Sequence, residues 1–125
     1  MEEPPNQKSE IENRKSTMRS KSFVRARSYR REGRLVPQRA GGLRAGAVVL
    51  RHGAIMDWHS TEAREELVIA LEGRACIEVQ ASRARMHRVM LAAGQCLFLP
   101  THTRHRVINR SQSRVRYLYV TAPVH

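Results

Sequence analysis

Short apolar segments separated by turn residues constrain the fold of this chain more than any other feature. No segment keeps apolar residues at a 3.6-residue period, so the pattern argues against amphipathic helices. Instead, seven or eight strand-like runs alternate with turn signals about every eight to twelve residues. This pattern predicts an all-β sandwich or barrel.

The predicted strands occupy most of the chain after residue 34. They cover residues 47–50, 55–61, 65–71, 75–79, 87–91, 96–99, 104–108 and 114–121. Residues 75–79 follow the turn at Glu72 and Gly73, so we expect them to pair back on residues 65–71 as a hairpin. We expect the polar residues 80–85 to form a loop.

The first 33 residues differ in composition from the rest of the chain. The whole chain has a formal net charge of +12, and no acidic residue occurs from Asn13 to Arg31, where arginines and serines accumulate. Such a segment buries too little apolar surface to offset its ordering entropy. We therefore predict a disordered basic arm at residues 1–33 and one barrel domain at residues 34–125.

Three interpretations of the arm stay open. It could bind nucleic acid through phosphates. If translation starts at Met18, its Arg-rich and Ser-rich composition is typical of an organellar transit peptide. The leader could also result from the choice of start site.

The hydropathy of the sequence indicates where in the cell we expect the protein. No run approaches the 18 or so apolar residues of a membrane span, and the polar N-terminus lacks a signal peptide's apolar region. We expect a cytoplasmic protein, or one of an organellar matrix if the start is Met18. Cys76 and Cys96 lie in apolar runs, so we expect both to be buried free thiols.

Two clusters of polar residues carry the candidate chemistry. The first has the spacing G-x5-H-x-T-x4-E-x6-G from Gly53 to Gly73, and the second has G-x5-P-x-H-x2-H-x3-N from Gly94 to Asn109. His59, Glu66 and His105 fall on three short strands. Two imidazoles and a carboxylate with open positions suit non-haem iron, and zinc or manganese could also bind.

These spacings resemble the paired motifs of the cupin superfamily. The matching positions are Gly53, His59, Glu66, Gly73, Gly94, Pro100, His105 and Asn109. The resemblance implies a small single-domain cupin, whose fold is a double-stranded β-helix, or jelly-roll, barrel. It also implies a homodimer, in which residues around 35–50 add a strand to the partner.

The chain departs from the family pattern at two positions. Thr61 stands where the family commonly has a second histidine, and His102 stands where it has glycine. The resemblance therefore implies a metal held by His59, Glu66 and His105 without the usual fourth ligand. We expect Thr61, His102 and Tyr117 to contact a ligand or water, with His102 alternatively a replacement imidazole.

Several functions fit this pattern. With iron, the expected chemistry is oxygen-dependent oxidation of a small molecule; with zinc or manganese, it is isomerisation or Lewis-acid polarisation. One alternative is a metal-free cupin that binds a small ligand as a sensor, with the three residues in a hydrogen-bonded cluster. The other is a nucleic-acid-associated protein. By strand parity Arg104 and Arg106 point outward, onto a solvated face or an anion-binding surface.

Overall fold

The computed structural model describes residues 24–125, so most of the predicted arm lies outside the described residues. The strands are β1 (Gly33–Arg34), β2 (Arg44–Leu50), β3 (Ile55–Ser60), β4 (Arg64–Glu72), β5 (Arg74–Ser82), β6 (Arg85–Ala92), β7 (Cys96–Leu99), β8 (Arg104–Ile108) and β9 (Val115–Pro123). No helix in the described part of the chain is long and apolar enough to cross a membrane. The predicted all-β class is confirmed.

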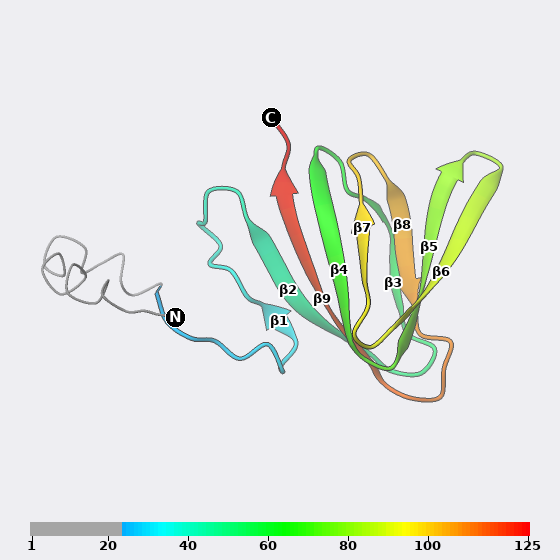
Figure 1. The fold of residues 1–125 in the computed structure, drawn as a ribbon, viewed down its shortest axis with the longest axis horizontal. Coiled ribbons are helices and arrows are strands. Elements are labelled where there is room, and N and C mark those ends of the chain that lie inside the picture. The colour runs from blue at the N-terminus through cyan, green and yellow to red at the C-terminus, as the bar shows by residue number, and fades with distance from the viewer. Residues whose placement is uncertain (1–23) are drawn as a thin grey trace, which may run out of the picture.

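Two antiparallel sheets form the barrel. The five-stranded sheet has the order β1-β2-β9-β4-β7, and the four-stranded sheet has the order β3-β8-β5-β6. In Figure 1 the two sheets converge at one end and spread apart at the other. Consecutive strands repeatedly change sheet, which is the jelly-roll arrangement that the resemblance to cupins implied.

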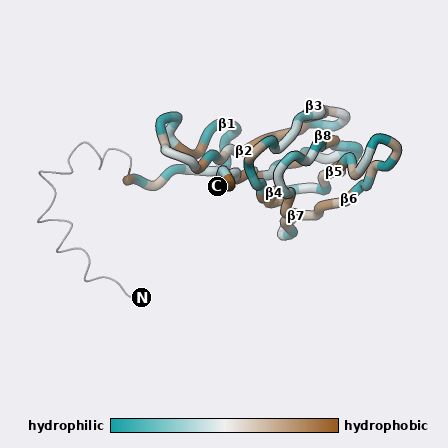
Figure 2. Tube along the Cα trace, turned by 90° about the horizontal axis from the view of Figure 1, so that it is seen from above, coloured by the Kyte–Doolittle hydropathy of each residue, from teal (hydrophilic) through white to brown (hydrophobic). Residues whose placement is uncertain are grey.

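The hydrophobic core fills the space between the two sheets. Its fully buried members come from the inward face of each strand, where side chains alternate with period two. They include Val68, Ile77, Val107 and Val115, which are at most 2% exposed. In Figure 2 hydrophilic and hydrophobic colours alternate along the strands, as expected when one face of each sheet is buried and the other is not.

Two details of the predicted strand pattern are wrong. β5 pairs with β6 and β8 and not with β4, because the turn at Gly73 carries the chain from one sheet to the other. Residues 80–85 are mostly strand and not loop, since β5 and β6 continue as a hairpin to the pair Ser82 and Arg85. Polar composition predicted a loop there because both sides of this hairpin tip face solvent.

The cysteines are both free, but only one is buried. Cys76 is buried, whereas Cys96 is exposed. The prediction of two buried thiols is therefore wrong for Cys96, which pairs with Ile69 on the outer side of the five-stranded sheet. An apolar run of sequence does not distinguish the two faces of a strand.

Part of the motif spacing serves the scaffold. Gly73 has a φ of 78°, and a Cβ there would lie 2.5 Å from the carbonyl oxygen of Arg114, so only glycine fits this turn without strain. Asn109 is fully buried, and its side-chain amide donates hydrogen bonds to the carbonyls of Leu50 (2.9 Å) and Ser113 (2.7 Å). These residues fix the turns that bring the sheets together.

Candidate metal centre

A β-bulge in β3 directs His59 into the barrel. Met56 is opposite Val107 and His59 is opposite His105, so β3 uses one more residue than β8 between these pairs. Such a bulge shifts the alternation of side chains by one. His59 therefore lies on the inner face beside His105, while its neighbour Trp58 lies on the outer face next to the arginines of β8.

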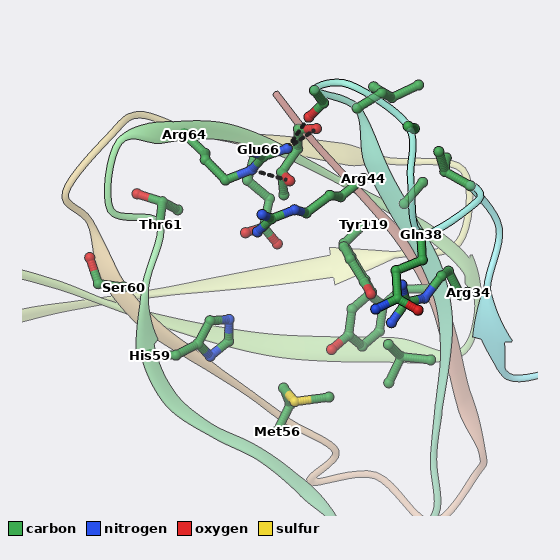
Figure 3. Close-up of a pocket in the computed structure, with 18 of the residues that line it drawn as sticks. Arg34, Gln38, Arg44, Met56, His59, Ser60, Thr61, Arg64, Glu66 and Tyr119 are labelled. Atoms are coloured by element: carbon green, nitrogen blue, oxygen red, sulfur yellow. Dashed lines mark hydrogen bonds between the residues drawn. The ribbon is translucent and has the colours of Figure 1, made fainter. Parts of the chain in front are cut away.

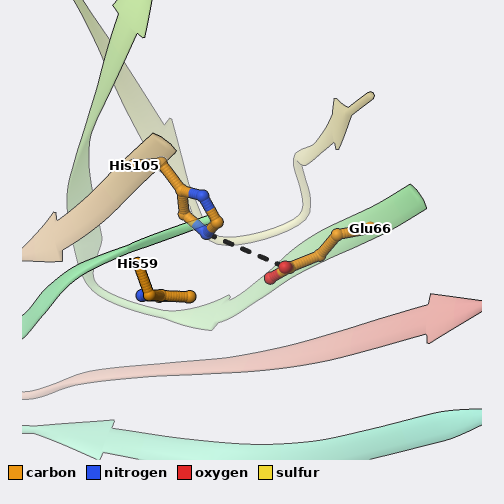
Figure 4. Close-up of side chains that lie close together, drawn as sticks. All are labelled: His59, Glu66 and His105. Carbon is orange, nitrogen blue, oxygen red and sulfur yellow. Dashed lines mark ion pairs between the residues drawn. The ribbon is translucent and has the colours of Figure 1, made fainter. Parts of the chain in front are cut away.

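The three predicted ligands meet between the sheets (Figure 4). Nε2 of His105 lies 3.7 Å from Oε1 of Glu66, and the ring centroids of His59 and His105 are 4.2 Å apart. One donor atom from each of the three residues lies within 4.8 Å of the others. His59 comes from β3, Glu66 from β4 and His105 from β8, so both sheets contribute.

Backbone carbonyls orient both imidazoles. Nδ1 of His59 lies 2.8 Å from the carbonyl oxygen of Asp57, and Nδ1 of His105 lies 3.2 Å from that of Thr103. A carbonyl only accepts, so Nδ1 of each ring carries the proton and donates it. Each Nε2 is then left with a lone pair, which is the state that a metal ion requires of a neutral imidazole.

The buried carboxylate is not neutralised by the surrounding side chains. Glu66 is 8% exposed, and burial raises its pKa, an effect that the charge of His59 opposes. His105 is 1% exposed, and burial lowers its pKa against the opposing hydrogen bond to Thr103. Burial thus favours a neutral His105 and penalises an ionised Glu66, so a cation beside the carboxylate would be favourable.

The donor set fits a divalent ion. Metal–nitrogen and metal–oxygen bonds are about 2.1 Å long, so two ligands of one ion lie at most about 4.2 Å apart. The observed separation of up to 4.8 Å must therefore shrink by at least about 0.6 Å, and tetrahedral ligands, about 3.4 Å apart, require the side chains to close by more than about 1 Å. Two neutral imidazoles and one carboxylate suit iron, zinc or manganese and leave positions open for a small ligand.

A cavity of about 890 Å³ opens from the three residues toward β2 and the segment before it. Figure 3 shows His59 and Met56 on one side and Tyr119 with Arg34 on the other. Tyr119 lies directly against Gly46, where a Cβ would be 2.6 Å from the tyrosine ring. The missing side chain at Gly46 therefore allows the ring to lie along the wall of the cavity.

Of the three residues predicted to contact a ligand, two line the cavity and one does not. Thr61 and Tyr117 line the cavity, and both are buried. The Thr61 hydroxyl donates a hydrogen bond to the carbonyl of Pro100 (2.6 Å) and accepts one from the amide of Thr103 (2.9 Å), so it is occupied by the backbone. Burial raises the pKa of Tyr117 and keeps its hydroxyl protonated.

His102 does not reach the cavity. It is exposed, and it is not among the described residues that line this space. Its φ is 54°, in the left-handed region that glycine adopts freely and most other residues avoid. The geometry explains why the cupin motif has glycine at this position.

Three arginines of the cavity were missed by the sequence analysis: Arg34, Arg44 and Arg64. Nε of Arg64 donates to the hydroxyl of Thr121 (2.8 Å), and its Nη2 donates to the carbonyls of Thr121 and Gly42. Burial and the positive charge of Arg44 lower the pKa of Arg64. Strand parity could have identified Arg64, because it shares the inner face of β4 with Glu66.

Comparisons with known proteins agree with this geometry. Residues 46–121 match the family model described as "Cupin domain". A comparison with curated protein sequences found no match. Solved structures do match, among them the Schizosaccharomyces pombe Cnp3 cupin domain, with 17% identity and a TM-score of 0.64 over 74% of this chain and 64% of that one.

Two further structures show the range of these matches. TT1209 from Thermus thermophilus has 25% identity and a TM-score of 0.62, covering 83% of this chain and 93% of that one. A recombinant oxalate oxidase in complex with glycolate has 14% identity and a TM-score of 0.61, covering 66% of this chain and 42% of that one. The chain thus spans less than two-thirds of the Cnp3 cupin-domain structure and less than half of the oxidase.

Proposed function

The chain belongs to the cupin family, and from this premise we propose that it is a metal-dependent cupin that binds or transforms a small molecule in its barrel. The observation that carries the proposal is the meeting of His59, Glu66 and His105 in the lining of the 890 Å³ cavity. Elsewhere in residues 24–125, no other group of three such side chains is close enough to hold an ion.

The chain's own residues would prepare the site for a divalent ion. The carbonyls of Asp57 and Thr103 hold the two imidazoles in the required tautomer, and Glu66 supplies the negative charge. When bound, iron would supply oxygen-dependent oxidation, whereas zinc or manganese would supply Lewis-acid polarisation or isomerisation. The recombinant oxalate oxidase, which has a similar fold, is an oxidase.

The arginines of the cavity favour an anionic small molecule. Arg34, Arg44 and Arg64 bring three positive charges, and Asp57 and Glu66 are the acidic residues in the described lining. Hydrogen bonds from Nε and Nη2 to neutral oxygens hold Arg64 in place, so its Nη1 group is oriented and left to bind a carboxylate or phosphate. We expect Tyr117 and Tyr119 to contact the apolar part of the ligand.

Metal content tests this proposal most directly. Untagged protein that has not passed over a nickel column should carry close to one iron, zinc or manganese per chain by elemental mass spectrometry. His105→Ala should lose the metal and stay folded by circular dichroism, whereas His87→Ala, which changes an exposed histidine, should keep it. Less than a tenth of an equivalent, with no uptake of added ions, would exclude the metal site.

The alternative is a metal-free cupin that binds a small ligand as a sensor. The hydrogen-bonded hydroxyl of Thr61, at the family's second histidine position, favours it because this group offers no replacement ligand. This alternative predicts no metal but thermal stabilisation by some anionic metabolite. If metal-free protein is stabilised by such a metabolite and Arg44→Gln removes that stabilisation, the sensor is favoured over the metal-dependent enzyme.

We also propose that the outer face of the five-stranded sheet joins two copies of the chain. Phe98 is 55% exposed and Leu67 is 37% exposed, and these two residues are opposite each other on β7 and β4. Partly exposed Ile69, Leu118 and Val120 extend this apolar face. Large exposed apolar patches mark interaction sites. Phe98→Glu should convert a dimer to a monomer in light scattering.

Three earlier predictions stay predictions. Strand exchange by residues around 35–50 is one, and in the described chain β2 lies between β1 and β9 of its own sheet. Nucleic-acid binding by the basic arm is another, because residues 1–23 lie outside the described residues. The third is residence in the cytoplasm, or in an organellar matrix if the start is Met18.

A further inference from the structure

The outer face of the four-stranded sheet carries a second cluster of functional side chains. Arg104 and Arg106 of β8 point outward, as predicted, and Arg106 is opposite Glu78 of β5. Glu78 is in turn opposite Arg88 of β6. Trp58 of β3 completes this row, so all four strands contribute to the face.

Glu78 fixes three arginines on this face. Its carboxylate accepts hydrogen bonds from Arg88 (2.8 Å), Arg106 (2.6 Å) and Arg110 (3.4 Å) and is 0% exposed. The three guanidinium groups remain partly exposed, so they can still contact a partner. One negative charge among three positive charges leaves a net charge of +2 in the cluster, held in a defined geometry.

Trp58 connects this cluster to a second group of arginines, which consists of Arg83, Arg85 and Arg104. The guanidinium of Arg106 lies 4.8 Å from the centroid of the Trp58 ring, and that of Arg104 lies 5.5 Å from it. Both distances are in the range of cation–π contacts. Arg106 is therefore held by both Glu78 and Trp58, and the indole also lies beside residues at the tip of the hairpin of β5 and β6.

A small pocket lies beside Trp58 under this hairpin. Its volume is about 390 Å³, and it is lined by Trp58, Gln80, Arg83, Ala84, Arg85, Met86 and Arg104. Three of these seven residues are arginines and none is acidic. Within residues 24–125, no carboxylate forms an ion pair with Arg83, Arg85 or Arg104. An aromatic wall next to unneutralised guanidinium groups suits an anion that also carries a planar ring.

We propose that this outer face binds single-stranded nucleic acid, with phosphates on Arg83, Arg85 and Arg104 and a base against Trp58, where it takes the place of the Arg104 guanidinium over the ring. Guanidinium groups bind phosphate through paired hydrogen bonds, and stacking on an aromatic ring tolerates any base. The fixed arginines around Glu78 extend the positive surface along the bound nucleic-acid strand. The site is separate from the cavity, since Trp58 and His59 lie on opposite faces of β3.

The only tryptophan of the chain reports on this site directly. An oligothymidine of about twelve nucleotides, within the range bound by similar single-strand sites, should quench the fluorescence of the full-length protein saturably. A labelled strand measures affinity by anisotropy. The affinity falls as salt rises, and the slope of log K against log salt concentration is about 0.7 for each phosphate contact on single strands. A variant that loses two contacts should therefore reduce this slope by about 1.4.

Matched variants separate this face from general attraction to a basic protein. Arg83→Gln with Arg104→Gln should weaken binding at least tenfold at low salt. Arg51→Gln with Arg114→Gln removes the same charge from exposed residues outside this face and should change affinity less than threefold. Trp58→Ala should weaken binding about tenfold, and Trp58→Phe should restore most of it.

Three outcomes would overturn the proposal. Equal losses in the two double variants would show attraction by net charge alone. Binding by anisotropy without a change in Trp58 fluorescence would place the strand elsewhere, for example on the arm. Equal quenching by polyglutamate, with equal affinity, would make this face a site for acidic peptides and not for nucleic acid.

Discussion

Two buried carboxylates lie on opposite sides of the barrel wall and have opposite electrostatics. Glu78 is 0% exposed on the outer side, and hydrogen bonds and charges from Arg88 and Arg106 lower its pKa despite burial. Glu66 is 8% exposed on the inner side, where burial raises its pKa. Both carboxylates are shielded from solvent, but the arginines stabilise the charge of Glu78, whereas burial destabilises that of Glu66.

The difference shows which carboxylate belongs to the scaffold. Glu78 is neutralised by three arginines of its own chain, so its charge is satisfied without a ligand. Glu66 has a neutral imidazole at 3.7 Å and no arginine within ion-pair distance among the described residues. A buried charge without compensation is costly. A proton or a metal ion from solution would compensate the charge of Glu66.

The largest expected effect comes from removing the charge of Glu78. Glu78→Gln should lower the free energy of unfolding by roughly 3 kcal/mol, because charge-assisted hydrogen bonds to buried groups are lost. Urea denaturation of the metal-free protein measures this change. A loss below about 1 kcal/mol would mean that the exposed arginines regain their hydration and that the network stabilises little.

Glu66→Gln should separate stability from binding. Metal affinity should fall about a hundredfold, since an anionic ligand is replaced by a neutral amide. The unfolding free energy of the metal-free protein should stay within about 1 kcal/mol of the wild type at pH 8, because a penalised charge is removed. If instead this variant is as unstable as Glu78→Gln, both carboxylates are structural.

The pH dependence of Glu78 sharpens the comparison. Its pKa in the folded protein is below the usual 4.5, so the folded state binds fewer protons than the unfolded state in the window below 4.5. Its stabilisation is therefore complete above pH 4.5 and is lost as pH falls through the folded pKa. The stability difference between wild type and Glu78→Gln should shrink over this window; a constant difference would contradict the lowered pKa.

The smallest effect is expected at an exposed carboxylate. Glu72 is 41% exposed, and Arg114 at 3.2 Å is 58% exposed, so water screens their attraction. Arg114→Gln should change the unfolding free energy by less than about 1 kcal/mol. The same urea experiment tests it. An effect as large as that of Glu78→Gln would show that burial is not what distinguishes the carboxylates.

The sequence predicted which three side chains meet in the barrel better than it predicted their surroundings, for a physical reason. His59, Glu66 and His105 sit at fixed distances from turn glycines, so spacing alone was enough to select them. Glu78 and Arg106 come together only through the pairing of β5 with β8, which local patterns do not show. The orientation of Trp58 depends on a β-bulge, and the residues of β3 gave no signal from which this bulge could be predicted.

The departures from the cupin motif were visible, but their geometry was not. Thr61 was expected beside a ligand, and its hydroxyl is occupied by the backbone of Pro100 and Thr103. Arg44 and Arg64 were absent from the predicted site because charged strand residues are usually assigned to the solvent face. Their inward position depends on the strand parity that they share with Val48 and Glu66.

The contact between Gly46 and Tyr119 has a genetic consequence. Every glycine codon becomes an alanine codon by one nucleotide change, and a methyl group at position 46 would lie 2.6 Å from the tyrosine ring. The ring would then have to move, and the cavity is one of the spaces beside it. Under the proposed function, a single mutation would thus narrow the range of ligands while leaving His59, Glu66 and His105 intact.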